Sequence, residues 1–315
     1  MNHHAGSEGT TPGGSHPYSI RELEQALPRF SQFRFLGAGG FGAVFSAWDS
    51  TRKVFVALKL ARDNGDPSWQ QRFLQEFKIL ERLHSQHLVR VFDTGRVAVP
   101  LGGMALDHLW FTMEKCGLSV ADELPSLALD ERVRICLEML SALAELHVHD
   151  VVHRDLKPRN LFLTAKRHLK LGDFGIAKDL SGKSGGPTPT GYAMGTMEYM
   201  APERWKGQPQ KPERADIEWR PSDQYAAGVT AFHILSGGGY PLDFTGERPM
   251  AVLNAHLMGK LLELTIPELP GARCDELNRV FRRMLAKEPE RRYPDMARCR
   301  ADFEVALKHQ PLRRR

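Results

Sequence analysis

The 315-residue sequence contains no long uninterrupted apolar run. A membrane-spanning helix would need about eighteen consecutive apolar residues, and no such run occurs. The first residues, MNHHAGSEGTTPGGSHP, also lack the apolar segment of a secretory signal. These absences predict a soluble chain in the cytoplasm, without a membrane segment.

Cysteine is scarce as well. The four cysteines, Cys116, Cys136, Cys274 and Cys299, are scattered along the chain and form no CxxC pair. This spacing argues against a disulfide framework and against a zinc site, and it fits a reducing cytoplasm.

A long tract of a single charge sign is also missing. The formal net charge is +5, but acidic and basic residues are mixed along the chain, and the basic end PLRRR is short. Such mixing is typical of a solvated surface. We therefore expect no nucleic-acid partner.

Composition divides the chain into tails and a folded region. Residues 1–17 are mostly Gly, Ser, Thr, Pro and His, which bury too little apolar surface to fold. We predict a flexible tail over 1–17, a folded domain over 18–306 and a C-terminal tail over 307–315.

The hydrophobic pattern predicts strands first and helices second. The stretch FRFLGAGGFGAVFSAWDSTRKVFVALKLA is typical of three strands joined by a glycine turn and an Asp-Ser turn. SWQQRFLQEFKILERLH has the apolar spacing of an amphipathic helix, while HLVRVFDTG and HLWFTMEK favour strands. After ADEL the pattern is mostly helical, notably in ERVRICLEMLSALAELHVH and SDQYAAGVTAFHILSGG, with short strands around LFLT and LKLGD. This order predicts an α+β fold in two lobes.

The turn GAGGFGAV places Gly37, Gly39 and Gly42 between two strands. Glycines let backbone N–H groups approach an anionic ligand without a Cβ in the way. A dinucleotide-binding fold would need a helix after the glycines, but a strand follows here. On this stretch alone, a plain hairpin turn is an equal alternative.

Lys59 ends the apolar strand VALK. A lysine in this position must either reach solvent or meet an anion, and Glu76 on the following helix could supply one.

The ordered motifs GxGxxGxV, VALK, a helical glutamate, HRDLKPRN, DFG and APE resemble the eukaryotic-type protein kinase family over residues 30 to 306. MGTMEYMAPERW and MLAKEPERRYP are similar to bacterial members of the serine/threonine class. The resemblance implies a two-lobed kinase fold, with a β-rich N-lobe over 30–113, a hinge over 114–117 and a helical C-lobe over 118–306. It also implies transfer of the γ-phosphoryl group of ATP to Ser and Thr of protein substrates.

The resemblance assigns the reaction to five residues. Asp155 would accept the proton of the substrate hydroxyl, and Lys157 would hold the γ-phosphate. Asn160 and Asp173 would bind Mg²⁺, with Mn²⁺ as an alternative, because hard cations prefer oxygen ligands. Lys59 would contact the α- and β-phosphates.

A larger set of residues is implied in ATP binding. Val44 and Ala57 would lie on one side of the adenine and Phe162 on the other, with Met113 at the back. Backbone groups of the hinge would bind the adenine edge. The set comprises Leu36, Gly37, Ala38, Gly39, Gly40, Gly42, Val44, Ala57, Lys59, Glu76, Met113, Glu114, Cys116 and Phe162.

Regulation and structural support are implied for the remaining residues. Arg154 needs an anion, and the resemblance predicts a phosphate on Thr188 or Thr190 of the segment between DFG and APE. Glu203 should pair with Arg292. The structural set comprises His153, Phe174, Thr196, Glu203, Asp223 and Arg292, with Asp223 expected to hold the catalytic loop.

Two other function classes remain open at this stage. A nucleotide-binding scaffold without catalysis typically lacks the equivalents of Lys59, Asp155 or Asp173, and all three are present. A small-molecule kinase of related fold usually lacks the run GTMEYMAPE. The sequence specifies no physiological substrate, activating signal or oligomeric state, nor the role of a proline-rich, charged insert over 206–220.

Overall fold

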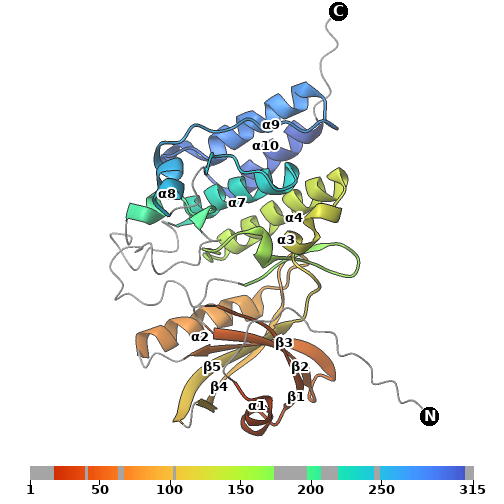
Figure 1. Ribbon diagram of the computed structural model, residues 1–315, viewed down its shortest axis with the longest axis vertical. Coiled ribbons are helices and arrows are strands. Elements are labelled where there is room, and N and C mark those ends of the chain that lie inside the picture. The colour runs from red at the N-terminus through yellow and green to blue at the C-terminus, as the bar shows by residue number, and fades with distance from the viewer. Residues whose placement is uncertain are drawn as a thin grey trace, which may run out of the picture. The chain divides into compact units, whose positions relative to one another are not determined.

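The computed structural model describes residues 18–39, 42–62, 67–101, 104–173, 197–206, 219–244 and 249–308. The chain forms two compact units, and Figure 1 colours it by residue number. The first unit is Met1–Glu81 with Val91–Lys115, and the second is Arg82–Arg90 with Cys116–Arg315. The predicted N-terminal tail, most of the segment between DFG and APE, and residues 207–218 of the predicted insert lie outside the described residues.

The first unit contains an antiparallel five-stranded sheet with the order β1-β2-β3-β5-β4. The glycine turn joins β1 to β2 as predicted. The strands are β1 (Phe30–Gly39), β2 (Gly42–Asp49), β3 (Val54–Arg62), β4 (Val91–Leu101) and β5 (Met104–Glu114).

Strands β4 and β5 form a hairpin that is longer than predicted. The first strand was predicted to end at Gly95 and the second to begin at His108. β4 continues through Pro100 because it is an edge strand, where proline is tolerated. A Cβ on Gly95 would lie 2.6 Å from the Trp110 ring, so this glycine permits close packing inside the strand.

One face of the sheet is covered by helix α1 (Ile20–Ala26), which the sequence analysis did not predict. Figure 1 shows α1 beside β1 and β4. The Tyr18 hydroxyl, just before α1, lies 2.9 Å from Nε2 of the buried His108 ring on β5. The core on this face comprises Tyr18, Leu23, Leu27, Phe30, Phe33, Ala43, Phe45, Ala47, Val56, Leu58, Leu60, Val97 and Val99.

The other face carries helix α2 (Pro67–Arg82), which the apolar periodicity predicted to within two residues at each end. Successive side chains of a strand point to opposite faces, so Phe111 lies on the face opposite His108. The ring centroids of Phe77 on α2 and Phe111 are 6.3 Å apart. Helix α2 is therefore anchored to this face by aromatic packing.

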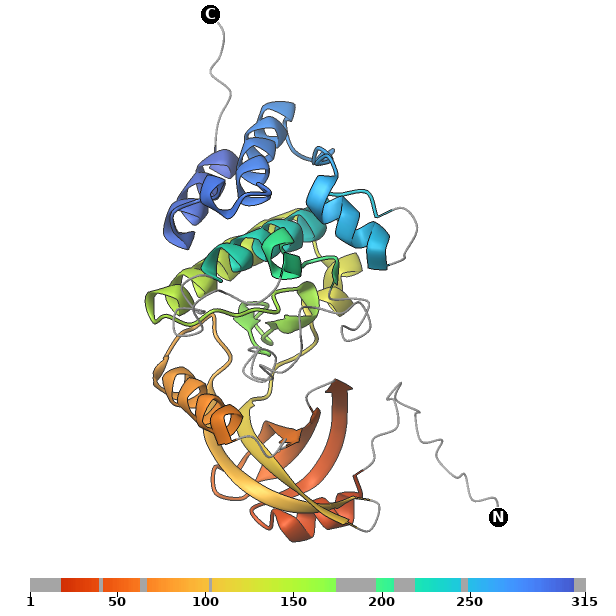
Figure 2. The same ribbon diagram turned by 90° about the vertical axis from the view of Figure 1, so that its left-hand side faces the viewer.

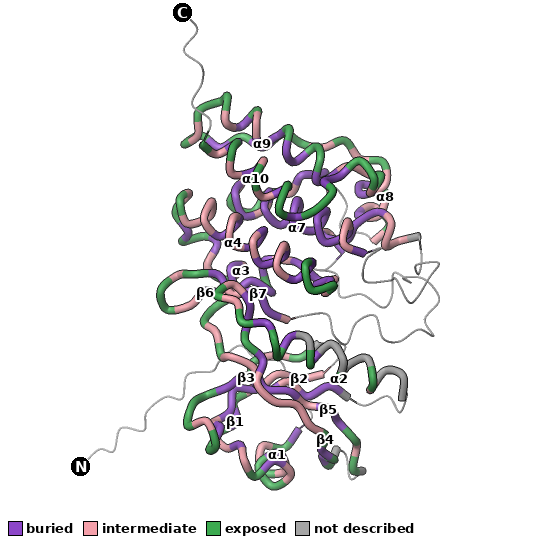
Figure 3. Tube along the Cα trace, turned by 180° about the vertical axis from the view of Figure 1, so that it is seen from behind, coloured by how far each residue is buried: buried purple, intermediate pink, exposed green. Residues whose placement is uncertain are grey.

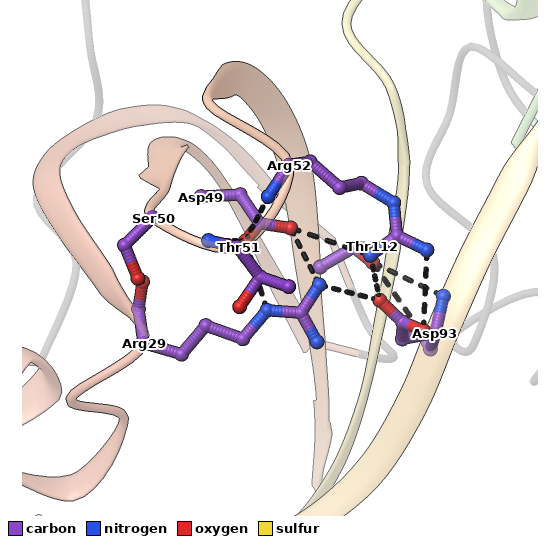
Figure 4. Close-up of polar contacts among 7 residues, drawn as sticks. All are labelled: Arg29, Asp49, Ser50, Thr51, Arg52, Asp93 and Thr112. Carbon is purple, nitrogen blue, oxygen red and sulfur yellow. Dashed lines mark hydrogen bonds and ion pairs between the residues drawn. The ribbon is translucent and has the colours of Figure 1, made fainter.

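A charge cluster ties the β2–β3 turn to the starts of β1 and β4 (Figure 4). The fully buried Asp49 carboxylate accepts hydrogen bonds of 2.8 and 2.6 Å from Arg29 and one of 2.9 Å from the Thr51 N–H. Arg29 also bonds to Asp93 at 2.6 Å, and Arg52 contacts the same carboxylate. Burial alone would raise the pKa of Asp49, but the hydrogen bonds from Arg29 and the turn keep it below its ordinary value.

The second unit is mostly helical, and Figure 3 shows the extensive burial along α7. Pro221 lies in the first turn of α7, where its missing N–H costs no helical hydrogen bond. None of the helices described here combines the length and apolar character needed to cross a bilayer. The α-helices are α3 (Val120–Glu123), α4 (Leu129–Val148), α7 (Arg220–Leu235), α8 (Pro249–Met258), α9 (Gly271–Met284) and α10 (Met296–Lys308). The shorter elements are η1 (Leu124–Ser126), η2 (Pro158–Asn160), β6 (Leu161–Leu163), β7 (Leu169–Leu171), η3 (Pro202–Lys206) and η5 (Pro289–Arg291).

Residues 82–90 group with the second unit, although the predicted N-lobe included them. The reason is a set of backbone hydrogen bonds to β7: Val89 N–H donates to the Leu171 carbonyl at 2.8 Å, and Leu171 N–H donates to the His87 carbonyl at 2.7 Å.

Helix α10 ends two residues beyond the predicted domain end, at Lys308. Figure 2 gives a second view of both units.

Candidate active site

Within the first unit, the predicted nucleotide-binding residues of β2, β3 and β5 share one face of the sheet. Val44 lies opposite Lys59, and Ala57 lies opposite Met113. Lys59 and Ala57 are two positions apart on β3, so all four side chains point to the α2 face. The Lys59 amino group lies 5.9 Å from the centroid of the Phe111 ring on that face. This face of the sheet therefore carries the apolar side chains of Val44, Ala57 and Met113 together with the amino group of Lys59.

The glycine turn is restricted most strongly at Gly42. Its φ is +139°, and an added Cβ would lie 1.8 Å from the Leu60 carbonyl oxygen. Only glycine fits this position, because β3 passes directly against the turn. Gly40 is outside the described residues. The predicted residues Leu36, Gly37, Ala38 and Gly39 all lie in β1.

The predicted hinge coincides with the boundary of the two units. Glu114 ends β5 and pairs with Val56, and the division falls between Lys115 and the partly exposed Cys116. Glu76 lies within α2, but the position of its side chain is outside what the structure describes.

In the second unit, the stretch HRDLKPRN folds into a compact polar loop that ends in η2. The Asp155 carboxylate is buried, with the residue only 4% exposed. Lys157 Nζ lies 3.1 Å from its Oδ2, and Asn160 Nδ2 donates to the same oxygen at 2.9 Å. Asn160 also donates to the Asp155 backbone carbonyl at 2.7 Å. These contacts fix the orientation of the carboxylate.

The oxygen donors of Asn160 and Asp173 fit a hard divalent cation. The Asn160 amide nitrogen is used toward Asp155, so the amide oxygen remains available as an acceptor. Asp173 follows β7 with a φ of +54° and is partly exposed. No group of three or more His, Cys, Asp or Glu that could hold a metal occurs among the described residues. A cation here would therefore take further ligands from phosphate and water, as Mg²⁺ commonly does.

Asp223, in the first turn of α7, holds the HRDLKPRN loop. Its carboxylate accepts hydrogen bonds from the backbone N–H groups of His153 (2.7 Å) and Arg154 (2.9 Å) and contacts His147 Nε2 at 2.9 Å. Burial would raise the pKa of Asp223, but the bonds from His147 and the loop lower it. Arg154 has a φ of +68°, so these bonds stabilise a backbone conformation that a non-glycine residue rarely adopts.

His153 connects the loop to the residue before Asp173. Its ring is completely buried, and burial lowers the pKa of His153, so the imidazole is neutral. Nδ1 accepts the Asp155 N–H at 3.3 Å, and Nε2 therefore carries the proton and donates to the Gly172 carbonyl at 3.0 Å.

The predicted pairing of Glu203 with Arg292 is present. Arg292 donates two hydrogen bonds to Glu203, of 2.7 and 2.8 Å, and the Arg292 side chain is completely buried. Ser222 adds a third bond to Glu203 at 2.7 Å. Burial would raise the pKa of Glu203, but the bonds from Arg292 and Ser222 keep it low. The pair joins η3 to the start of α7 and to the segment after η5.

One neighbour of the predicted site residues was missed from sequence. His147, in the last turn of α4, contacts the Asp223 carboxylate, although its only sequence signal is a histidine six residues before His153. Phe162 is in β6 and partly exposed. Phe174, Thr188, Thr190 and Thr196 are outside the described residues.

The sequence and the structure both match known proteins. The family model described as the protein kinase domain matches residues 30–304. The serine/threonine-protein kinase PknB of Mycolicibacterium smegmatis is 31% identical over 285 residues, which cover 87% of this chain and 42% of that protein. The probable serine/threonine-protein kinase SCO3848 of Streptomyces coelicolor is 30% identical over 290 residues, or 88% of this chain and 40% of that protein. This chain therefore spans about two fifths of the length of these curated relatives.

A similar solved structure is the crystal structure of a mutant of the Mycobacterium tuberculosis PknI kinase domain. It matches with a TM-score of 0.57 at 25% identity, and the match covers 89% of this chain and 96% of that chain.

Proposed function

This chain belongs to the protein kinase family, and on that premise we propose that it is an ATP-dependent serine/threonine protein kinase. The observation that supports the proposal most directly is the Asp155 carboxylate, which is buried and oriented by Lys157 and Asn160. A fixed carboxylate of this kind can accept the proton of an alcohol while the oxygen attacks phosphorus.

Charge neutralisation would come from two lysines. Lys157 is close to Asp155 and would bind the γ-phosphoryl oxygens as they leave the β-phosphate. Lys59, on the apolar sheet face, would bind the α- and β-phosphates. In this proposal Asp155 takes one proton from the hydroxyl, the new O–P bond forms, and ADP carries away the electron pair of the broken bond.

Asn160 and Asp173 would hold Mg²⁺ through an amide oxygen and a carboxylate, with Mn²⁺ as an alternative. Bound magnesium would neutralise phosphate charge. The bond from Asn160 to Asp155 would couple the metal ligand to the base, so that both groups keep one geometry.

Substitution of the reacting residues tests the proposal. Lys59→Met and Asp155→Asn should each lower phosphoryl transfer at least about a hundredfold, since each removes charge stabilisation or the proton acceptor. Asp130→Asn, an exposed carboxylate in the first turn of α4, is the matched control and should retain transfer.

The assay is transfer from labelled ATP to a generic basic protein, in parallel with an aminoglycoside, followed by phosphoamino-acid analysis. Phosphoserine and phosphothreonine in the protein support the proposal. Label in the aminoglycoside alone, or near wild-type transfer by Asp155→Asn, would contradict it.

We also propose autophosphorylation at Thr188 or Thr190, supported by Arg154, whose fixed charge lies next to Asp155. A phosphate offers about two negative charges and oxygens that can accept the guanidinium hydrogen bonds. Mass spectrometry should find the phosphate in protein purified with Asp155 intact but not with Asp155→Asn. An unmodified segment in a fully active enzyme would overturn this part.

We also propose that this protein is located in the cytoplasm. None of the four cysteines forms a disulfide, and burial raises the pKa of the Cys136 and Cys299 thiols, which favours the protonated, unreactive form. Immunodetection in separated cell fractions tests this location, and recovery outside the cytoplasmic fraction would contradict it.

A further inference from the structure

Gly172 lies between β7 and Asp173, and both of its backbone polar groups are hydrogen-bonded inside the second unit. Its N–H donates to the Asn160 carbonyl at 3.0 Å, and its carbonyl accepts a hydrogen bond from Nε2 of His153 at 3.0 Å. Gly172 is buried, and its φ is not positive. The backbone conformation at this position is therefore open to other residues, so the glycine must be required by the space around it.

The space beside Gly172 is filled by two side chains. A Cβ added to Gly172 would lie 2.7 Å from Cγ2 of Val89 and 3.2 Å from Cε2 of Phe162. Val89 has little room to move, because it is β-branched, 5% exposed, and bonded through its N–H to the Leu171 carbonyl at 2.8 Å. A methyl group on Gly172 would therefore push the chain away from Val89 and crowd the Phe162 ring.

The Phe162 ring can yield only by rotating about its own side-chain bonds, because the backbone of β6 is held on both sides. Phe162 pairs with Lys170 of β7. On the other side, the N–H of the next residue, Leu163, donates to the Leu118 carbonyl at 3.1 Å. Phe162 is partly exposed, so its ring can turn outward more easily than the buried Val89 can move.

Gly172 is also linked to both residues that would bind Mg²⁺. The Asn160 backbone carbonyl accepts the Gly172 N–H, and Asp173 is the next residue in the chain. Asp173 has a φ of +54°, which costs free energy in a residue other than glycine and persists only where the surrounding structure holds it. A displacement of Gly172 would therefore move both metal-binding residues.

We propose that Gly172 is a positioning residue, because its missing side chain seats the end of β7 directly against Val89 and Phe162. This close contact fixes the positions of the two metal-binding residues, Asn160 and Asp173. It also fixes the ring of Phe162, which would lie against the adenine. The inference rests on the nucleotide and metal binding of the proposed function, and it adds a residue that couples the two.

Binding of Mn²⁺ and of ADP tests this inference without phosphoryl transfer. Electron paramagnetic resonance measures Mn²⁺ binding in the presence of saturating ADP, and isothermal titration calorimetry measures ADP binding in the absence of metal. Gly172→Ala should weaken Mn²⁺ binding about tenfold, as expected when the support of a metal ligand is disturbed. It should weaken metal-free ADP binding about threefold, because the aromatic ring is displaced.

Second substitutions then trace each loss to one neighbouring side chain. Val89→Ala removes Cγ2, so the double variant with Gly172→Ala should bind Mn²⁺ within about twofold of Val89→Ala alone. Phe162→Leu removes Cε2, so in that background Gly172→Ala should change ADP binding less than about twofold. Gly271→Ala is the matched control, because a Cβ there would meet no atom within 4 Å, and it should retain both affinities.

Wild-type Mn²⁺ and ADP affinities in Gly172→Ala would overturn the inference. A loss of Mn²⁺ binding that Val89→Ala does not relieve would overturn it too, because the contact with Val89 would then not be the cause. If Gly172→Ala does not fold, each double variant is compared with Val89→Ala or Phe162→Leu alone. Equal affinities then support the inference, and a remaining loss contradicts it.

Failure of the proposed function would be visible separately. If the wild-type protein binds Mn²⁺ and ADP but phosphorylates neither the basic protein nor the aminoglycoside, the kinase proposal fails while the inference about Gly172 stands. If the wild-type protein binds neither ligand, both fail.

Discussion

Acid should destabilise the second unit in part through one histidine, His256 of α8, whose contribution can be isolated by substitution. The ring is completely buried, and its Nδ1 lies 2.9 Å from the Tyr225 hydroxyl. Burial disfavours the charged imidazolium and Lys287 repels it, while backbone groups of Met197 and Glu198 favour it. The result lowers the pKa of His256 to about 3. The folded protein therefore keeps this ring neutral through the range where a solvated histidine titrates.

The size of the effect follows from linkage. An unfolded histidine has a pKa of about 6.5, so between about pH 6.5 and about pH 3 the unfolded state binds more protons than the folded state. The stability that the neutral His256 ring contributes is therefore fully present above this window and is lost as the pH falls through it. From about pH 8 to about pH 5 the loss from His256 amounts to about 2 kcal/mol, and the effect levels off below about pH 3.

Urea unfolding followed by far-UV circular dichroism, at several pH values, measures this loss. His256→Asn removes the titrating ring but keeps an amide that can bond to Tyr225. Between about pH 8 and about pH 5, the free energy of unfolding should fall in both proteins. The fall in the variant should be smaller than that in the wild type by about 2 kcal/mol. His84→Asn, at an exposed position, should retain the wild-type dependence. An unchanged pH dependence in His256→Asn would refute the reasoning.

Three further substitutions test the packing described above. Gly42→Ala should lower the free energy of unfolding by about 2 kcal/mol and weaken ATP binding, because the new Cβ meets the Leu60 carbonyl at a φ of +139°. Thermal shifts with and without MgATP measure both effects, and a variant of wild-type stability would contradict the turn geometry. Arg292→Met should cost about 3 to 5 kcal/mol because it leaves the Glu203 carboxylate buried without its cation, and a loss below about 1 kcal/mol in urea unfolding would argue against the pair. Asp49→Asn should cost about 2 kcal/mol by weakening the bonds to the charge cluster of the first unit, and hydrogen exchange of the β2–β3 turn should increase; unchanged exchange would show that the charge has no structural role.

The grouping of Asp155, Lys157 and Asn160 was predictable because the motif that carries them is short and contiguous. Asp155, Lys157 and Asn160 lie within six positions, so a local pattern brings them together without knowledge of the rest of the fold. The pairing of Glu203 with Arg292 spans 89 residues and could be predicted only because the family resemblance names both partners.

The features that were missed depend on distant contacts. The segment IRELEQA becomes helix α1 because an apolar sheet face is available to it, and Tyr18 meets His108 across 90 residues. The fold likewise brings His147 to Asp223 over 76 residues. Local sequence carries no trace of such environments, since desolvation and partner choice are set by chain segments far away.

Helix α1 also decides where a usable fragment of this protein can begin. The family match starts at residue 30, so a fragment trimmed to that match would omit α1 together with Tyr18. Such a fragment would expose Phe45, Leu58 and the rest of this core face to water, and His108 would lose its tyrosine partner. An uncovered apolar sheet face promotes self-association. Expression plasmids should therefore encode the chain from Tyr18 or earlier, and insolubility of a shorter fragment would reflect the missing cover rather than a defect of the catalytic machinery.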